Sequence, residues 1–324
     1  MFLGYNTNGL AHHELFDAVE LLAEIGYRGV ALTIDHGVLP PRNRDVRRTV
    51  DRLRRRLEQL DMRSVLETGA RYLLDPRRKH EPTLLSDDRR RRIAFYRHAI
   101  DCAAQLNAAC VSIWSGALNA PISRNEAMDR LADGLVETLD YAVGQGVVVG
   151  LEPEPGMLID STAAFDELLR RIDRPDLGLT LDIGHLQCQG EPIATVIAHW
   201  GSRLVNVHLD DMRRGVHEHL MFGDGEISFP PVFQALRDVG YGGGASVELS
   251  RHSHVGPEAA SRAFAFLQPL VARRPVVLTI ARLAGTIEIF DALRGSGPCR
   301  IRLFCFRFPP CVKPTWPRCV IFGR

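Results

Sequence analysis

The chain has 324 residues, of which 45% are hydrophobic and 24% are charged, and its formal net charge is +1. This composition is typical of a soluble globular protein, and the near-neutral charge gives no reason to expect a nucleic acid or an anionic membrane as a partner. No apolar run approaches the length of a bilayer-spanning helix, and the first residues, MFLGYNTNGLAHHELF, lack a basic segment followed by a long apolar core. We therefore expect neither a membrane span nor a secretory signal.

Strand-like and helix-like segments alternate along the chain. Strands are predicted at residues 3–5, 28–35, 63–68, 110–115, 147–152, 177–182, 204–209 and 245–249. Helices are predicted at residues 12–26, 44–60, 86–107, 124–145, 161–172, 192–200, 231–239 and 257–270. Strict alternation makes the strands parallel, and eight such units over about 250 residues have the size of a (β/α)8 TIM barrel. A doubly wound open sheet alternates similarly, but it would spread out the polar residues that end several strands.

Two arginine-rich stretches, 42–56 and 89–92, fall on the second and third predicted helices. Because the helices of a barrel lie on its outside, we interpret both stretches as solvated faces rather than as a nucleic-acid patch. We expect the barrel domain to comprise residues 1–272 and residues 273–324 to form an irregular C-terminal extension. Residues 292–324 contain no Asp or Glu and show no usable period of 2 or 3.6. A tail without a catalytic role is our interpretation, while a partner-binding extension and a shifted reading frame remain open.

The chain contains seven cysteines, and no two of them have CxxC spacing. Without that spacing, neither a zinc knuckle nor a thiol–disulfide redox motif is indicated. Three of the cysteines are scattered through the first part of the chain, and the other four lie within the last 26 residues. We interpret them as reduced thiols and expect a cytoplasmic protein.

Four consecutive predicted strands end in a side chain that can bind a metal ion. Residues 179–185 read LTLDIGH and bring one strand to its end at Asp182, and the other three strands end in Glu152, His208 and Glu248. Each residue alone has a structural explanation, as a helix cap, a core histidine or a loop residue. In a barrel all four point into one mouth, where three carboxylates and an imidazole need a cation to join them. Such oxygen-rich ligands favour one divalent ion, Mn²⁺, Mg²⁺ or Co²⁺, with Zn²⁺ as a further candidate.

The segments GLEPEPG, LTLDIGH, NVHLDD, HLMFGDGEISF and SVELS resemble motifs of the xylose isomerase-like barrel superfamily. This superfamily includes sugar phosphate isomerases and epimerases, ketose 3-epimerases, inosose dehydratases and endonuclease-IV-type repair enzymes. The resemblance implies that the four strand-end residues bind one divalent metal ion. It also implies that His185 binds substrate or a second metal. Arg214 matches a position from which some epimerases reach substrate oxygens, and His219 matches a ligand histidine of the endonuclease branch.

The sequence departs from both branches of the superfamily at identifiable positions. Endonuclease members carry ligand histidines after strands two and three. Here His36 follows strand two, but strand three ends in Glu67, Thr68 and a glycine and offers no histidine. The 3-epimerases have a further Glu six residues after the ligand of strand five, where this chain has Leu158 and the nearest carboxylate is Glu154.

The chemistry that such a site can perform follows from the types of residue present. Moving a hydrogen α to a carbonyl requires a base and stabilisation of the resulting enediolate. Glu152 and Glu248 can act as bases from opposite faces, and the metal ion can stabilise the enediolate as a Lewis acid. Trp114, at the end of strand four, is either an apolar wall against the carbon face of a sugar or a core aromatic of the barrel top.

We therefore expect a metal-dependent isomerase or epimerase whose partner is a small carbohydrate: a sugar, a sugar phosphate or a similar polyol. The alternatives are an endonuclease-IV-like phosphodiesterase, an inosose-type dehydratase and a binding protein that has lost turnover. We expect no membrane or nucleic-acid partner, and the sequence is compatible with a homo-oligomer.

Overall fold

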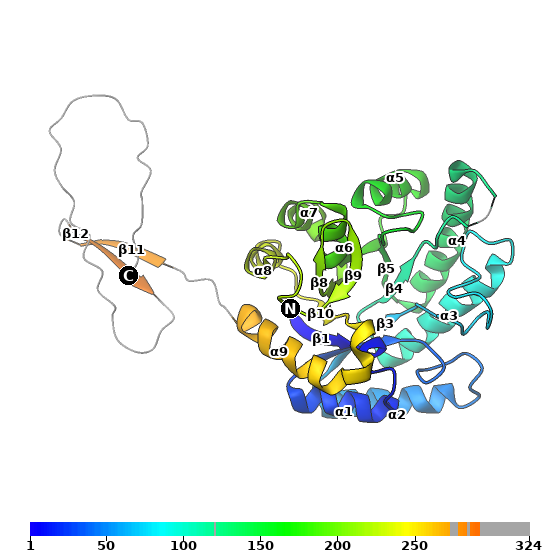
Figure 1. Cartoon of the computed structure of the whole chain (residues 1–324), viewed down its shortest axis with the longest axis horizontal. Helices are drawn as coiled ribbons and strands as arrows, with labels where there is room; N and C mark the ends of the chain where they lie inside the picture. The colour runs from blue at the N-terminus through cyan, green and yellow to red at the C-terminus, as the bar shows by residue number, and fades with distance from the viewer. Residues whose placement is uncertain (120, 273–277, 284–285, 292–324) are drawn as a thin grey trace. The chain divides into compact units, whose positions relative to one another are not determined.

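Eight parallel strands close into a barrel, which confirms the predicted fold class (Figure 1). The strands are paired in chain order, and the last of them pairs with the first to close the barrel. They are β1 (Phe2–Asn6), β2 (Gly29–Thr33), β3 (Arg63–Glu67), β4 (Val111–Trp114), β5 (Val149–Glu152), β6 (Leu177–Asp182), β7 (Leu204–Leu209) and β10 (Gly244–Val247).

The computed structural model describes residues 1–119, 121–272, 278–283 and 286–291. Residues Met1–Ala272 form one compact unit that contains the barrel, and residues Arg273–Arg324 form a second unit. In the second unit, β11 (Leu278–Leu283) and β12 (Thr286–Asp291) form an antiparallel pair. The expectation for residues 292–324 lies outside the described residues.

Helices surround the barrel and connect successive strands (Figure 1). They are α1 (Leu15–Ile25), α2 (Val46–Gln59), α3 (Arg89–Leu106), α4 (Arg124–Gln145), α5 (Thr162–Ile172), α7 (Ile193–Trp200), α8 (Phe229–Asp238) and α9 (Gly256–Ala272). No helix in the described ranges is both long and apolar enough to span a lipid bilayer.

Helix ends follow local capping chemistry where the sequence signal is strong. The Ser161 hydroxyl accepts a hydrogen bond from the backbone NH of Ala164 and caps α5, and α4 ends at Gly146, whose φ of +68° suits a glycine. The sequence analysis predicts that the third helix begins at residue 86, but α3 does not begin there. The helix begins three residues later, after Asp88, and the Ser86 hydroxyl donates to Glu81 instead.

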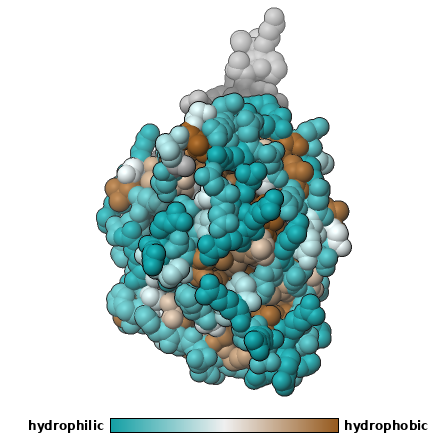
Figure 2. Space-filling view, turned by 90° about the vertical axis from the view of Figure 1, so that its right-hand side faces the viewer, coloured by the Kyte–Doolittle hydropathy of each residue, from teal (hydrophilic) through white to brown (hydrophobic). Residues whose placement is uncertain are grey.

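The molecular surface is largely polar where the arginine-rich helices are exposed. Figure 2 shows the side on which α3 and α4 lie in Figure 1, and hydrophobic residues occur there only in small separate groups. The interpretation of residues 89–92 as a solvated face needs one correction. Arg92 is fully buried, because its guanidinium turns inward beneath the loop that follows β3.

Two elements at the mouth of the barrel have no counterpart in the predicted pattern. The short helix α6 (Ile183–Gln189) follows β6 directly, and β8 (Asp211–Arg213) forms a hairpin with β9 (Val216–Leu220) after β7. The Asp211 carboxylate accepts hydrogen bonds from the backbone NH groups of Gly223, Gly225 and Ile227. It thereby fixes the loop that follows the hairpin against the barrel. The hairpin is short and polar, so it lacks the apolar alternation that identifies a strand.

Candidate active site

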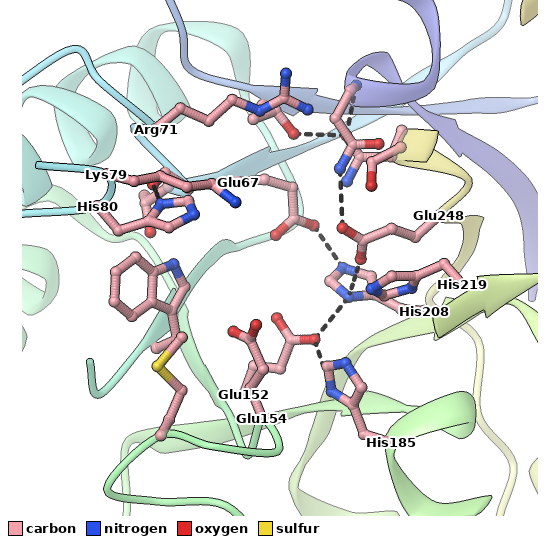
Figure 3. Close-up of a pocket in the computed structure, with 18 of the residues that line it drawn as sticks. Glu67, Arg71, Lys79, His80, Glu152, Glu154, His185, His208, His219 and Glu248 are labelled. Carbon is pink, nitrogen blue, oxygen red and sulfur yellow. Dashed lines mark hydrogen bonds and ion pairs between the residues drawn. The ribbon is translucent and has the colours of Figure 1, made fainter. Parts of the chain in front are cut away.

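The four residues predicted as metal ligands lie together at the C-terminal ends of the barrel strands. Figure 3 shows three of them, Glu152, His208 and Glu248. Glu152 and Asp182 are the last residues of β5 and β6, His208 lies in β7, and Glu248 follows β10 directly. Each offers one ligand atom, and these atoms all lie within 4.8 Å of one another. Parallel strands deliver their C-terminal side chains to one face of a barrel, so residues 96 positions apart in sequence share one site.

The two ring nitrogens of His208 face different partners. Nδ1 lies 3.1 Å from Glu152 Oε1, 3.0 Å from Glu248 Oε2 and 3.9 Å from Asp182 Oδ2. Nε2 lies on the other side of the ring, 2.9 Å from Glu67 Oε1. The three carboxylates of the candidate metal site therefore converge on Nδ1 alone.

The electrostatics of this cluster fit a bound cation. Burial alone would lower the pKa of His208, but the carboxylates of Glu67, Glu152 and Glu248 raise it well above its usual range. Burial also raises the pKa of Glu152 well above its usual range. Asp182 Oδ2 is buried without a hydrogen-bond partner among the described residues. Positive charge is needed at the centre of this cluster, and a divalent ion with oxygen ligands would supply it and give Asp182 Oδ2 a partner.

The LTLDIGH motif places Asp182 in two roles at once. One carboxylate oxygen accepts a hydrogen bond of 3.0 Å from the backbone NH of His185 and caps α6, while the other points into the ligand cluster. The capped turn directs His185 to the same mouth, where its Nδ1 lies 3.5 Å from Glu152 Oε1. Gly184 is required at this turn because a Cβ there would collide with the carboxylate of Asp210.

A second group of potential ligands lies beside the first. His185, His217 and His219 each offer a ring nitrogen within the same 4.8 Å limit, and Nε2 of His217 lies 3.1 Å from Nε2 of His185. His219 also pairs with the carboxylate of Asp210. Burial opposes protonation of His219, but Asp210 raises its pKa to about 10. Sequence reasoning identified His185 and His219 but missed His217 and Asp210, although the HEH alternation and the paired aspartates of NVHLDD were visible signals.

A cavity of about 560 Å³ opens in front of the ligand cluster. Glu154 and Trp114 both line it, as the sequence analysis expects of substrate-contacting residues. Burial and the charge of Glu248 raise the pKa of Glu154 to about 7. Trp114 is only 7% exposed, and the guanidinium of Arg92 lies 5.0 Å from its ring. This tryptophan is thus both a wall of the cavity and a part of the barrel-top core.

Arg214, which the resemblance to epimerases predicts to reach substrate oxygens, lies between β8 and β9. It is exposed at the tip of the β8–β9 hairpin and is not among the residues that line the cavity. Its backbone NH donates to Glu226, and its guanidinium lies against Gly190. His36 is likewise exposed and lines a different surface cavity.

Glu67 is the buried acid that sequence reasoning overlooked. It ends β3, and its Oε1 accepts hydrogen bonds of 2.9 Å from both Asn206 Nδ2 and the imidazole of His208. Asn8 plays a comparable part on the other side of the cluster, where its amide donates to Glu248 Oε1 at 2.8 Å. The comparison with endonuclease members predicts a ligand histidine at the end of strand three. It gives no role to a carboxylate that orients another ligand.

Eight parallel strands closed into a barrel, with helices between them and a polar site at the C-terminal mouth, define the class of protein as a TIM barrel. Residues 19–270 match the family model described as xylose isomerase-like TIM barrel, so the chain belongs to this family.

Individual relatives differ in how much of the chain they match. The inosose dehydratase of Geobacillus thermodenitrificans is 33% identical over 148 residues, which are 40% of this chain and 50% of that protein. L-ribulose-5-phosphate 3-epimerase UlaE of Shigella flexneri serotype 5b is 25% identical over 228 residues, which are 66% of this chain and 80% of that protein. The chain spans about half the length of the inosose dehydratases and of other curated relatives at comparable identity.

The barrel is also similar to solved structures. The crystal structure of the IolI protein with a bound zinc atom superimposes with a TM-score of 0.68 at 20% identity. The superposition covers 84% of this chain and 98% of that protein. At this level of identity the similarity establishes the shared fold.

Proposed function

We propose that this protein is a divalent-metal-dependent isomerase or epimerase that moves a proton α to the carbonyl of a sugar, sugar phosphate or similar polyol. The observation that supports this most directly is the convergence of Glu152, Asp182 and Glu248 on His208 Nδ1, in front of a cavity of sugar size. The relatives matched over the chain include a sugar phosphate epimerase and an inosose dehydratase.

The ligand set assigns roles to individual residues. Glu152, Asp182, His208 and Glu248 would hold the ion, which when bound supplies Lewis acidity toward adjacent oxygens of the substrate. Glu152 and Glu248 approach the site from different strands, so one carboxylate can take the α-proton while the other delivers a proton to the opposite face. The Asn8 amide holds one oxygen of Glu248 and leaves the other directed at the cluster.

The remaining lining residues suit a polyhydroxylated substrate. His185 and His219 offer ring nitrogens to substrate hydroxyl groups beside the ion, and Glu154 offers a carboxylate from the segment after β5. The ring of Trp114 supplies an apolar surface for the carbon face of a sugar.

The proposal is tested by exchange of the substrate α-proton with solvent deuterium. Glu152→Gln and Glu248→Gln keep an oxygen donor but lose the basic site, so with saturating Mn²⁺ we expect exchange on a keto-sugar panel to fall on the order of 10²–10⁴-fold. Both variants should still bind the sugar. Glu137→Gln, on the exposed surface of α4, is the matched control. Near-normal exchange in both active-site variants contradicts the proposal.

An inosose-type dehydratase is a second candidate, supported by the 33% identity to the Geobacillus protein over half its length. The same carboxylate would remove the α-proton, but a neighbouring hydroxyl would then leave as water. Net loss of water from an inosose, measured by mass spectrometry, distinguishes this reaction from isomerisation or epimerisation, in which the substrate loses no water.

An endonuclease-IV-like phosphodiesterase is a third candidate, supported by the second ligand group at His185, His217 and His219. Such chemistry requires more than one metal ion at the site. Elemental analysis of the purified protein that finds one ion per chain, with no cleavage of abasic-site DNA, rules it out.

A further inference from the structure

Three arginine and lysine side chains line the same cavity as the candidate metal ligands. They are Arg71, Lys79 and Arg251. Arg251 Nη1 lies 3.1 Å from Glu218 Oε1. Arg71 Nε lies 4.0 Å from Asp35 Oδ2, which is the distance limit for an ion pair. Lys79 is exposed and has no ion-pair partner in the described part of the chain. The cavity thus contains one unpaired cation and one weakly paired cation.

These cations stand on the wall that faces the ligand cluster. Figure 3 shows Arg71, Lys79 and His80 on one side of the cavity and His185, His208, His219 and Glu248 on the other. The cationic wall, by which we mean the side chains of Arg71 and Lys79, belongs to the loop of residues 68–88 that connects β3 to α3. A substrate whose carbonyl end lies at the ligand cluster therefore extends toward this wall.

A buried arginine holds the cationic wall from beneath. The guanidinium of Arg92 donates to the backbone carbonyls of Thr68 at 3.2 Å, His80 at 2.5 Å and Pro82 at 2.8 Å. It also lies about 5 Å from the ring of Trp114. Burying a guanidinium is costly unless its donors are satisfied. Here the donors bond to backbone carbonyls at two separate places in one loop, Thr68 on one side and His80 and Pro82 on the other. A loop with only a covering role would not require such a contact.

The loop backbone is held in a defined and uncommon conformation. Ala70, Arg71 and His80 have φ values of 59°, 37° and 66°, a region that residues other than glycine rarely adopt. The His80 backbone NH donates to the carbonyl of Arg71 at 2.6 Å, and its ring bonds the carbonyl of Gly69. Strained backbone of this kind persists where the surroundings enforce it, commonly at ligand-binding sites. Arg71 and Lys79 are thus presented from a preorganised frame.

We propose that the substrate carries an anionic group, a phosphate ester or a carboxylate, at the end remote from its carbonyl, and that Lys79 and Arg71 bind this group. The assignment of the carbonyl end rests on the proposed function, whereas the anion site rests on the cationic wall itself. A neutral sugar would leave Lys79 without an ion-pair partner among the described residues, whereas an anion gains charge-assisted hydrogen bonds from two side chains.

Binding of non-reacting probes tests the anion site without any catalytic step. Calorimetry would compare a hexitol with its 6-phosphate and with the matching aldonate carboxylate. Charge-assisted hydrogen bonds lead us to expect the preferred anion to bind on the order of 10- to 100-fold more tightly than the hexitol. Equal affinity for all three probes overturns the proposal, and the better of the two anions identifies the group.

Variants assign the anion to the cationic wall. Lys79→Met should reduce the preference for the anion, because only Arg71 then remains to bind it, and should leave the affinity for the hexitol unchanged; Lys79→Arg should retain the preference. Arg78→Met is the matched control, because Arg78 is paired with Asp75 and does not line the cavity. An anion preference that is undiminished in Lys79→Met, or one that Arg78→Met reduces equally, overturns the assignment.

The outcomes for the reaction and for the anion site are separable. If no sugar exchanges its α-proton but anion binding depends on Lys79, the proposed function fails and the anion site stands. If neutral and phosphorylated sugars are turned over with equal kcat/KM, the function stands and the anion site is wrong.

Discussion

At the scale of single residues, the imidazole of His208 organises the site. Its Nδ1 faces three carboxylates, and its Nε2 faces Glu67, which is itself fixed by the amide of Asn206. Histidines that bind metals generally donate their second NH to a carboxylate or carbonyl, which fixes the tautomer and the ring orientation. Glu67 therefore has the position of a residue that orients a ligand rather than one that touches substrate.

This geometry predicts a loss of metal affinity in Glu67→Gln. The amide oxygen is a weaker acceptor than a carboxylate oxygen for the His208 and Asn206 donors, so the ring is less firmly held. Loss of such a partner typically weakens metal binding about 10- to 100-fold. Competition with a chelator for Mn²⁺ and Zn²⁺, on the full chain, measures the effect, with Glu137→Gln as the control. An unchanged dissociation constant would show that Glu67 has only a packing role.

A second prediction concerns the double role of Asp182. Asp182→Asn keeps an oxygen that can accept from the His185 NH, so we expect α6 and the circular dichroism spectrum to be retained. The buried negative charge is lost, so metal content measured by plasma emission should fall strongly. Full metal stoichiometry in this variant would remove Asp182 from the ligand set.

At the scale of elements, the loops that follow the strands differ in how they are held. The segment after β6 is held by its own helix cap, the segment after β9 by Asp211, and the cationic wall by Arg92. In each case one buried polar side chain fixes a loop through its backbone groups. Loops of this kind can carry binding residues with the precision of regular structure.

We expect Arg92→Met to destabilise the protein more than any neighbouring substitution in α3. The variant leaves three backbone carbonyls without their donor, and each buried carbonyl left unsatisfied costs about 1–3 kcal/mol. Urea denaturation followed by fluorescence measures the free energy of unfolding, and the exposed Arg90→Met serves as the control. Equal stability of the two variants would show that other contacts hold the loop.

Some of these features are marked by a local sequence pattern and others depend on contacts between distant residues, and only the first kind could be predicted from the sequence. The strands β6 and β7 begin and end at the predicted residues, because an apolar run that ends in an acid or a histidine marks both a strand and a ligand. The hairpin β8–β9, Glu67 and the burial of Arg92 could not be predicted in the same way. Their roles depend on contacts between side chains and backbone far apart in the chain, and an arginine within RRRR carries no local sign that it turns inward.

At the scale of the whole molecule, the candidate site draws on strands from both halves of one barrel. Met1–Ala272 is a compact unit that contains every residue of the ligand cluster and of the cationic wall. The eight strands close on themselves within this unit, so no strand of the barrel has an edge that requires a partner from outside.

We therefore expect a chain truncated after Ala272 to fold and to bind metal as the full chain does. Thermal unfolding and metal content, compared between the truncated and full chains, are the measurements. A large loss of either would show that residues 273–324 contribute to the barrel.

The separation of the ligand cluster from the cationic wall bears on how this family diversifies. The ligand cluster belongs to β5, β6, β7 and the residue after β10, whereas the cationic wall belongs to the β3–α3 connection and is anchored by a helix on the outside of the barrel. In the proposed function, chemistry and substrate choice are thus encoded in separate stretches of the gene. Grafting residues 68–92 from a relative should exchange substrate preference as a module and leave the reaction intact. Descendants of such a barrel can acquire new substrates through one loop and its anchoring arginine, without passing through an ancestor that has lost its catalytic centre.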